Sequence, residues 1–293
     1  MEKQTIGEAL KRASFLLRNA GIDDPRFEAE MLLANLLSVD RLKLLCVSQE
    51  SLDQRQSIIF EELLQRRCSG EPAAYIVGHK YFYGRLFYVN KNVLIPRPET
   101  ELVIDVALKS YQSMNHLKKR PLYCLDLGTG CGALAITLAL ELPGSIIYAV
   151  DLCSEALEIA AYNATMLGAT GQVHFVQGDY YSALREESVR QFDLIISNPP
   201  YIKKADLEQL PRSIRHYEPR LALEGGMDGL DAYRRIINGS PAYLRSRGAL
   251  VVEIGHDQEE SVSTLYRESG QFKVIKTYPD LAGHQRVIAG FTS

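Results

Sequence analysis

The sequence of 293 residues contains no apolar run of the length that crosses a membrane. A membrane-spanning helix needs about 20 consecutive apolar residues, and a secretory signal needs an apolar core after a basic start. The segment of residues 1–10 instead mixes charged and polar side chains with single apolar ones. We therefore expect neither membrane insertion nor export, and no membrane as a partner.

Cysteine and histidine are few, and their spacing excludes the common metal sites. The five cysteines form no CxxC pair, and none has a histidine nearby at the spacing of zinc ligands. The six histidines lack any partner pattern, so we expect no metal. We interpret the cysteines as reduced thiols of a cytoplasmic protein; they are Cys46, Cys68, Cys124, Cys131 and Cys153.

The chain also lacks an excess of basic charge. Its 33 Lys and Arg stand against 36 Asp and Glu, which gives a formal net charge of −3. Nucleic-acid binding depends on positive charge, so this balance favours a protein or a small molecule as the partner. A composition with 46% hydrophobic and 24% charged residues is typical of a globular protein with a sizeable core.

The length favours one main domain with a smaller partner, and the pattern along the chain divides accordingly. Apolar residues recur at helical spacing from Ile6 to about Arg67, which predicts a small helical domain over residues 1–72. Residues 73–98 are rich in β-branched and aromatic side chains with glycine breaks, which predicts a β-hairpin linker. Residues 99–293 form the remaining domain, where strand and helix patterns alternate.

This alternation predicts an α/β domain with a parallel sheet that helices cover on both faces. The predicted parallel strands are residues 122–127, 146–151, 173–177, 192–197 and 249–254, with helices starting near Ala133, Ser154, Asp228 and Asp257. The chain then ends in two apolar runs, residues 272–277 and 286–291, without a helix between them, which predicts a terminal antiparallel hairpin. Seven strands in this arrangement resemble the Rossmann-like fold of S-adenosylmethionine-dependent methyltransferases.

A glycine-rich turn follows the first predicted strand and opens the next helix. Glycine lets backbone approach a ligand closely at such a turn, although a lone glycine turn can also be a tight connection without a ligand. The spacing GxGxG is one residue shorter than the GxGxxG that binds a dinucleotide pyrophosphate, and S-adenosylmethionine has no phosphate. The spacing thus favours S-adenosylmethionine as the cofactor; the residues are Asp126, Leu127, Gly128, Thr129 and Gly130.

Acidic residues follow the second and third predicted strands. Asp151, with Leu152 beside it, is placed to accept the hydroxyl hydrogens of a ribose. Asp179 can accept a hydrogen bond from the adenine amine, and Tyr180 can cover the adenine ring. Taken singly, Asp151 could cap the next helix and Asp179 could be a turn residue. Ligands of open α/β sheets bind at the carboxyl ends of strands, so these positions together favour a cofactor site.

The run Ser-Asn-Pro-Pro-Tyr after the fourth predicted strand is the most specific signal in the chain. It resembles the Asn-Pro-Pro-Tyr signature of methyltransferases that act on amide or exocyclic nitrogens. An amide nitrogen is a poor nucleophile, so the site must hold its hydrogens and direct its free face at the methyl group. The Asn198 oxygen and the Pro199 carbonyl can accept these hydrogens, Pro200 keeps Pro199 extended, and Tyr201 can pack on the planar substrate group.

Three longer stretches extend the resemblance over nearly the whole chain: residues 70–78, residues 93–101, and residues 218–229. With the Asn-Pro-Pro-Tyr run, they resemble the release factor glutamine methyltransferases, the PrmC or HemK family. The resemblance implies methylation of the glutamine in the Gly-Gly-Gln loop of class I peptide chain release factors. It implies that the cofactor is bound by Asp126–Gly130, Asp151 and Tyr180, and the substrate amide by Asn198–Tyr201. It also implies that Tyr180 stands where relatives often carry Trp, a residue absent from this chain.

Other functions have less support in the sequence. A methyltransferase for a ribosomal-protein glutamine would share the same motif and differ in its amino-terminal domain. A methyltransferase for a nucleic-acid base would need a basic face, but residues 1–85 carry equal numbers of basic and acidic side chains. The GxGxG spacing disfavours a nicotinamide oxidoreductase, and the intact Asn-Pro-Pro-Tyr run disfavours an inactive scaffold. We expect the helical domain to dock a second region of the release factor, because one glutamine offers few contacts.

Overall fold

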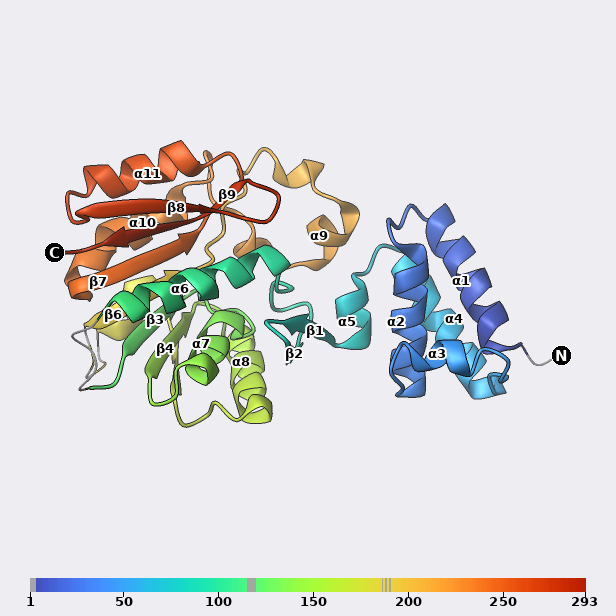
Figure 1. Ribbon diagram of the computed structural model, residues 1–293. Coiled ribbons are helices and arrows are strands. Elements are labelled where there is room, and N and C mark those ends of the chain that lie inside the picture. The colour runs from blue at the N-terminus through green and yellow to red at the C-terminus, as the bar shows by residue number, and fades with distance from the viewer. Residues whose placement is uncertain (1–3, 115–119, 186, 188, 190) are drawn as a thin grey trace. The chain divides into compact units, whose positions relative to one another are not determined.

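The computed structural model describes residues 4–114, 120–185, 187, 189 and 191–293. The chain forms two compact units, shown in Figure 1. The first contains the chain up to His79 together with Pro211–Tyr217, and the second contains Lys80–Leu210 and Glu218–Ser293. Within the described residues, no helix combines the length and the apolar character needed to cross a membrane.

The first unit is helical, as its periodicity predicts. Its helices are α1 (Ile6–Asn19), α2 (Pro25–Leu37), α3 (Lys43–Cys46), α4 (Gln54–Cys68), α5 (Ala73–Val77) and α9 (Arg212–Tyr217). Side-chain caps fix where the longer helices begin: Thr5 and Glu8 form a capping box on α1, and Asp24 caps α2 just before Pro25. A core that includes Leu10, Leu17, Leu33 and Phe60 is fully buried between them.

The predicted linker hairpin is shorter than the sequence pattern suggests. Residues Ala73–Val77 form α5 after Pro72, and Gly78 ends this helix with φ of +81°. The hairpin itself contains only β1 (His79–Phe82) and β2 (Arg85–Tyr88). The expectation that β structure begins at residue 73 is therefore wrong. A five-residue apolar run satisfies helix and strand patterns equally, and the preceding proline and following glycine decide for a helix.

A short segment of residues 99–293, the range predicted to form the larger domain, belongs to the helical unit instead. Helix α9 lies in Pro211–Tyr217, inside the range 99–293 that the sequence pattern assigns to one domain. The Tyr217 hydroxyl lies 3.2 Å from the Ser69 hydroxyl, and the Arg212 side chain lies close to the Cα of Gly70. The first unit is thus built from two separate segments of the chain.

The second unit contains a seven-stranded sheet in the order β5-β4-β3-β6-β7-β9-β8. Its strands are β3 (Tyr123–Leu127), β4 (Ile146–Asp151), β5 (Val173–Gln177), β6 (Phe192–Ser197), β7 (Leu244–Glu253), β8 (Val274–Pro279) and β9 (Gln285–Phe291). Strands β3 to β7 pair in parallel, and β9 pairs antiparallel with both β7 and β8. The predicted α/β sheet and its terminal hairpin are confirmed.

Helices cover both faces of this sheet (Figure 1). One face carries α6 (Glu101–Ser113), α7 (Ala133–Glu141) and α8 (Ser154–Leu167), and the other carries α10 (Asp231–Gly239) and α11 (Glu259–Glu268). Because both faces are covered, β6 is buried at all six positions. A core of Leu125, Ile195, Ile236, Val252 and Tyr266 joins the sheet to α10 and α11.

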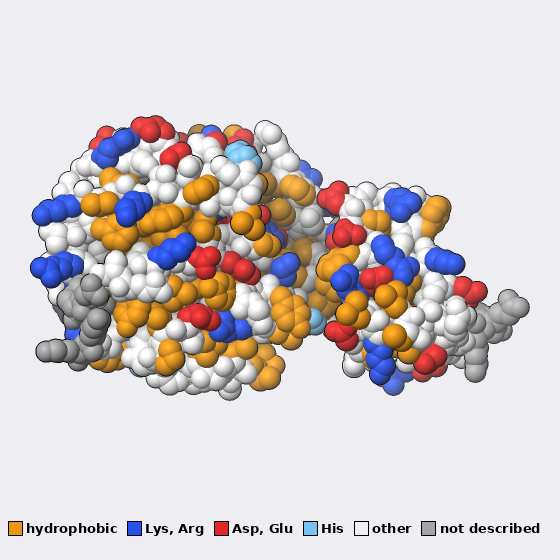
Figure 2. Space-filling model, viewed as in Figure 1, with side chains coloured by type: hydrophobic (Ala, Val, Ile, Leu, Met, Phe, Trp, Pro, Cys, Tyr) orange, Lys and Arg blue, Asp and Glu red, His pale blue; other side chains and the backbone are white. Residues whose placement is uncertain are grey.

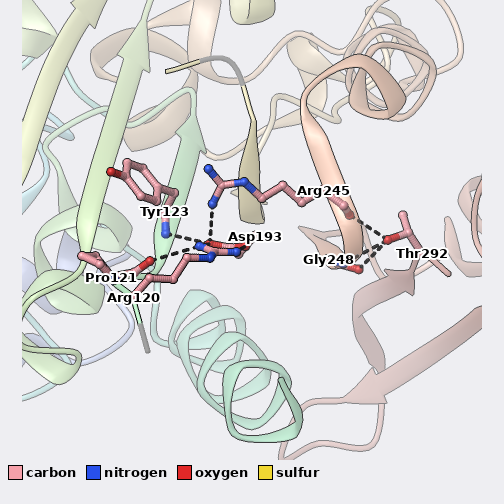
Figure 3. Close-up of polar contacts among 7 residues, drawn as sticks. All are labelled: Arg120, Pro121, Tyr123, Asp193, Arg245, Gly248 and Thr292. Atoms are coloured by element: carbon pink, nitrogen blue, oxygen red, sulfur yellow. Dashed lines mark hydrogen bonds and ion pairs between the residues drawn. The ribbon is translucent and has the colours of Figure 1, made fainter. Parts of the chain in front are cut away.

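A buried aspartate joins the amino ends of the central strands (Figure 3). The Asp193 carboxylate accepts hydrogen bonds from the Arg120 guanidinium at 2.6 and 2.8 Å, from Arg245 at 3.0 Å and from the Tyr123 backbone N–H at 3.0 Å. Burial alone would raise the pKa of Asp193, but these hydrogen bonds and positive charges lower it overall. Ligands of such sheets bind at the opposite, carboxyl ends of the strands, so this cluster stabilises the fold away from the site.

Candidate active site

The glycine-rich turn lies between β3 and α7, where the sequence predicts it. Gly128 and Gly130 have φ of +77° and +56°, in the left-handed region that favours glycine. The backbone N–H groups of Gly128 and Thr129 donate to the Val150 carbonyl at 2.9 and 3.0 Å, which fixes the turn over the end of β4. The space where a Cβ of Gly128 or Gly130 would lie is open, so a ligand can approach the backbone there.

Asp126 supports this turn from within the sheet. Its Oδ2 accepts a hydrogen bond from the Thr129 hydroxyl at 2.7 Å, and burial raises the pKa of Asp126 to about 7. Its Oδ1 is buried without a hydrogen-bond partner among the described residues. Such an oxygen is costly unless a donor reaches it. Asp126 thus holds the glycine-rich turn from below and does not itself line the cavity described below.

Asp151 ends β4 and fastens the glycine-rich turn. One carboxylate oxygen accepts from the Gly130 N–H at 2.8 Å, and the other accepts from the Cys153 N–H at 3.0 Å. A carboxylate has about four acceptor positions, so two remain for a ligand. Burial raises the pKa of Asp151, while hydrogen bonds from the backbone of Cys153, Gly130 and Leu152 act in the opposite direction. Asp151 and Leu152 both line the cavity described below.

Asp179 and Tyr180, the residues predicted to contact adenine, both interact with an arginine that sequence reasoning missed. Asp179 forms an ion pair with Arg235 of α10 at 2.5 Å, and the Arg235 guanidinium lies 4.7 Å from the centre of the Tyr180 ring. Tyr180 has φ of +49°, and burial raises its pKa to about 12. Because Arg235 lies 56 residues after Asp179, no local pattern in the sequence indicates this pairing.

A cavity of about 410 Å³ brings these residues together. This volume lies within the range of small-molecule sites. Its lining comes from the carboxyl ends of β3, β4, β5 and β6 and from segments around residues 91–94, 219–224 and 231–235. The predicted residues in the lining are Gly128, Gly130, Asp151, Leu152, Asp179, Tyr180, Asn198 and Pro200, whereas Asp126, Leu127, Thr129, Pro199 and Tyr201 lie outside it.

The Asn-Pro-Pro-Tyr run begins where β6 ends. The Ser197 hydroxyl donates to the Leu127 carbonyl at 2.6 Å, which holds this run beside the glycine-rich turn. The Asn198 side chain donates through Nδ2 to the Thr100 hydroxyl at 3.0 Å. Asn198 and Pro200 line the cavity, while Pro199 is buried. The amide of Asn198 is thus held on its nitrogen side at the wall of this cavity.

Tyr201 is turned toward the protein interior more than the sequence suggests. Burial raises its pKa well above the ordinary value, and the Glu253 carboxylate acts in the same direction. Its backbone carbonyl accepts a hydrogen bond from the Gln258 amide at 3.1 Å, and the same Gln258 nitrogen donates to the Gly229 carbonyl at 3.2 Å. The predicted packing of the Tyr201 ring on a substrate group stays a prediction.

Two of the long sequence stretches pack directly around this run. A Cβ on Gly225 would lie 2.8 Å from the Cα of Tyr201 and 2.9 Å from the Pro200 carbonyl oxygen, so only glycine fits. The buried Glu218 pairs with Arg97 and accepts from the Ile95 N–H at 3.3 Å. Sequence reasoning missed Glu218 and Gln258 as supports, because their partners are distant in the chain.

The sheet order and the glycine-rich turn after β3 fit an S-adenosylmethionine-dependent methyltransferase. No group of three or more His, Cys, Asp or Glu within the described ranges could hold a metal ion.

Residues 8–78 match the family model of the PrmC N-terminal domain, and residues 109–227 match that of the methyltransferase small domain. A human methyltransferase 10 domain containing protein has a similar fold, with 18% identity and a TM-score of 0.53, over 71% of this chain and 88% of that one.

Curated relatives match along almost the entire chain. The release factor glutamine methyltransferase of Moorella thermoacetica is 39% identical over 99% of this chain and 98% of its own length. That of Koribacter versatilis is 40% identical over 98% of this chain and 97% of its own length. The chain belongs to the family of release factor glutamine methyltransferases.

Proposed function

We propose that this enzyme transfers a methyl group from S-adenosylmethionine to the glutamine amide in the Gly-Gly-Gln loop of class I peptide chain release factors, in the cytoplasm, and so modulates translation termination. The observation that carries the proposal is Asn198, whose amide nitrogen is bound to Thr100 while its side chain lines the cofactor cavity. With its nitrogen bound to Thr100, the Asn198 amide directs its oxygen into the cavity. A substrate amide in the cavity can donate an N–H hydrogen to this oxygen.

The residues of this chain bind and orient the two reactants. Asp151 would accept the ribose hydroxyls, Asp179 and Tyr180 would contact the adenine, and Asp126 would hold the glycine-rich turn that faces the cofactor. S-adenosylmethionine supplies a methyl group on a positively charged sulfur. Asn198 and the Pro199 carbonyl would hold the hydrogens of the glutamine amide so that its nitrogen faces that methyl group. One of these hydrogens leaves as a proton to water, since an alkylated amide cation is strongly acidic.

The helical unit would supply specificity for the release factor. A glutamine side chain alone offers few contacts, so selection of one glutamine needs surface remote from the methyl group. Large apolar side chains of the helical unit are exposed, with Phe15 at 62%, Leu42 at 69%, Leu45 at 61% and Ile58 at 54%. On the face in Figure 2, apolar, basic and acidic side chains of this unit are interspersed, which suits a protein partner.

One experiment separates this function from the two related ones. The enzyme is incubated with isotope-labelled S-adenosylmethionine and, in separate reactions, with purified release factors, ribosomal proteins or DNA. Mass spectrometry then locates the label. The proposal expects label on the glutamine of the Gly-Gly-Gln loop. Label on a ribosomal-protein glutamine or on a base amine would instead favour the corresponding alternative and overturn the proposal.

A further inference from the structure

The amino-terminal half of α10 places an arginine beside the two residues predicted to contact adenine. Asp231, Ala232 and Arg235 of this helix all line the cavity. Arg235 forms an ion pair with Asp179 at 2.5 Å, and its guanidinium lies 4.7 Å from the centre of the Tyr180 ring. One side chain of α10 therefore contacts both of the predicted residues.

Local backbone structure does not account for the side chains of Asp179 and Tyr180. Asp179 precedes a short 3-10 helix at Tyr180–Leu184, but its carboxylate makes no capping hydrogen bond with the described residues. Tyr180 has φ of +49°, in the left-handed region, which is unfavourable for a bulky side chain. Backbone in this region persists only where surrounding contacts maintain it. In this protein those contacts include the Arg235 guanidinium.

The Asp179–Arg235 ion pair presents hydrogen-bond acceptors and donors side by side at the cavity. The Arg235 guanidinium donates through one nitrogen to one oxygen of Asp179. A carboxylate has about four acceptor positions, so others remain for a ligand, and the guanidinium keeps further N–H groups. Adenine has the matching pattern, an amine that donates next to a ring nitrogen that accepts. Hypoxanthine has an oxygen in place of this amine, and a carboxylate would repel that oxygen.

We propose that Arg235 is a positioning residue of the cofactor site, which holds the Asp179 carboxylate and the Tyr180 ring so that they select adenine. The guanidinium restricts the orientation of the carboxylate, and it packs on the Tyr180 ring as a cation–π contact. Both side chains are thereby ordered before a ligand binds, which lowers the entropy cost of binding. This role rests on the proposed function, because it requires that the cavity binds S-adenosylmethionine.

The main variant is Arg235→Gln, which removes the charge and the guanidinium and keeps a polar side chain. The calorimetric Kd for S-adenosylmethionine, measured without a methyl acceptor, is expected to rise by about five- to twentyfold. This effect is modest because the side chains of the ion pair are 52% and 44% exposed, and solvent weakens such pairs. Arg235→Lys keeps the charge but not the planar contact with Tyr180, so its Kd should lie between those of wild type and Arg235→Gln. Unchanged or tighter binding by Arg235→Gln would overturn the inference.

The neighbouring arginine of α10 provides a matched control. Arg234 forms ion pairs with Asp228 and Asp231, and its side chain is 42% exposed. It lies outside the cavity lining that the described residues form. Arg234→Gln should therefore leave the Kd for S-adenosylmethionine within about twofold of the wild type. Thermal unfolding of both variants without cofactor checks that the fold is kept. An equal rise in Kd for both variants would assign the effect to the helix or to net charge and refute the positioning role.

A deaminated ligand tests the selection of adenine. S-inosylhomocysteine carries an oxygen where S-adenosylhomocysteine carries the amine of adenine. The wild type should bind the adenosyl form at least about tenfold more tightly, because the Asp179 carboxylate accepts from the amine and repels the oxygen. The ratio of the two Kd values should shrink at least about threefold in Arg235→Gln and stay unchanged in Arg234→Gln. An unchanged ratio in Arg235→Gln would overturn the selective role.

Turnover separates cofactor binding from the methyl transfer itself. With intact release factor, Arg235→Gln should raise the KM for S-adenosylmethionine in step with the Kd, and turnover at saturating cofactor should stay within about threefold of the wild type. A fall in turnover with an unchanged KM would place Arg235 in the orientation of the methyl group and overturn the inference. A wild type that binds S-adenosylmethionine but methylates no release factor would refute only the proposed function.

Discussion

Replacing Asp193 by Asn should destabilise the sheet of the second unit without touching the cofactor cavity. Asn has the same shape but no charge, and it offers one acceptor oxygen in place of two. The Asp193 carboxylate accepts three hydrogen bonds from Arg120 and Arg245 and one from the Tyr123 backbone. The variant must leave some of these donors unpaired and two guanidinium groups without a counter-charge.

The expected magnitude follows from how far these groups are buried. Removing one partner of a buried ion pair costs about 3–5 kcal/mol. The Asp193 side chain is 1% exposed, but those of Arg120 and Arg245 are 37% and 27% exposed, so water can partly solvate them. We therefore expect a loss of about 2–3 kcal/mol, below the range for a fully buried pair. In a unit of this size, that loss lowers the unfolding midpoint by about 5–10 °C.

The assay must report on the second unit alone, because a chain with two units need not unfold in one step. Amide hydrogen exchange of β3, β6 and β7, measured by mass spectrometry, provides this local readout. Asp206→Asn, at an exposed aspartate without an ion pair among the described residues, is the matched control. An Asp193→Asn variant that exchanges no faster in these strands than the control would refute the reasoning.

The direction of the Asp193 pKa shift determines how the stability loss in Asp193→Asn changes with pH. The pKa of Asp193 is lowered in the folded protein, so its stabilising contribution is present above the pKa of the unfolded chain. That contribution is lost as the pH falls through the lowered folded value. The difference in stability between wild type and Asp193→Asn should therefore be full at pH 7 and shrink below about pH 4. A difference that grew on acidification would contradict the assigned charge state.

The remaining predictions concern binding and turnover. Asp151→Ala should weaken S-adenosylmethionine binding by at least about tenfold in calorimetry, since it removes a charged acceptor and loosens the turn at Gly130; an unchanged Kd would remove Asp151 from the site. Asn198→Ala should lower single-turnover methylation by about 100-fold with cofactor affinity within a few-fold, whereas equal losses would assign it to holding the loop. A variant with serine in place of Phe15, Leu42, Leu45 and Ile58 should raise the KM for intact release factor at least about tenfold and leave the KM for a short Gly-Gly-Gln peptide unchanged. The control Met166→Ser in the second unit is exposed at 66% and should change neither value.

The sheet could be predicted because its signals are local. Strands buried on both faces read as apolar runs, and those at residues 146–151 and 192–197 begin and end where the sequence predicts. The edge strand at residues 173–177 also has the predicted bounds, although only Val173 in it is buried. The cavity residues on the glycine-rich turn and after β4 and β5 follow from the rule that ligands bind at the carboxyl ends of parallel strands. The prediction of short elements failed, as for α5, because five residues are too few to distinguish the helical period from the strand period.

The supports of the site could not be predicted, because each depends on a pair of residues far apart in the chain. Thr100 meets Asn198 across 98 positions, and Arg97 meets Glu218 across 121 positions. A single sequence shows the residue types of such pairs but not their proximity. Gly225 is a further example, since its lack of a Cβ is explained only by the backbone of Tyr201 beside it.

The division of the helical unit into two chain segments limits how this protein can be taken apart. The chain leaves that unit after His79, returns to it for Pro211–Tyr217 and leaves it again. The two units are therefore connected by three crossings of the backbone. Removing or exchanging the first 79 residues would strip α9 of the residues it packs on, such as Ser69. A chimera that moves the helical unit onto another methyltransferase must therefore include Pro211–Tyr217 as well as the amino-terminal segment.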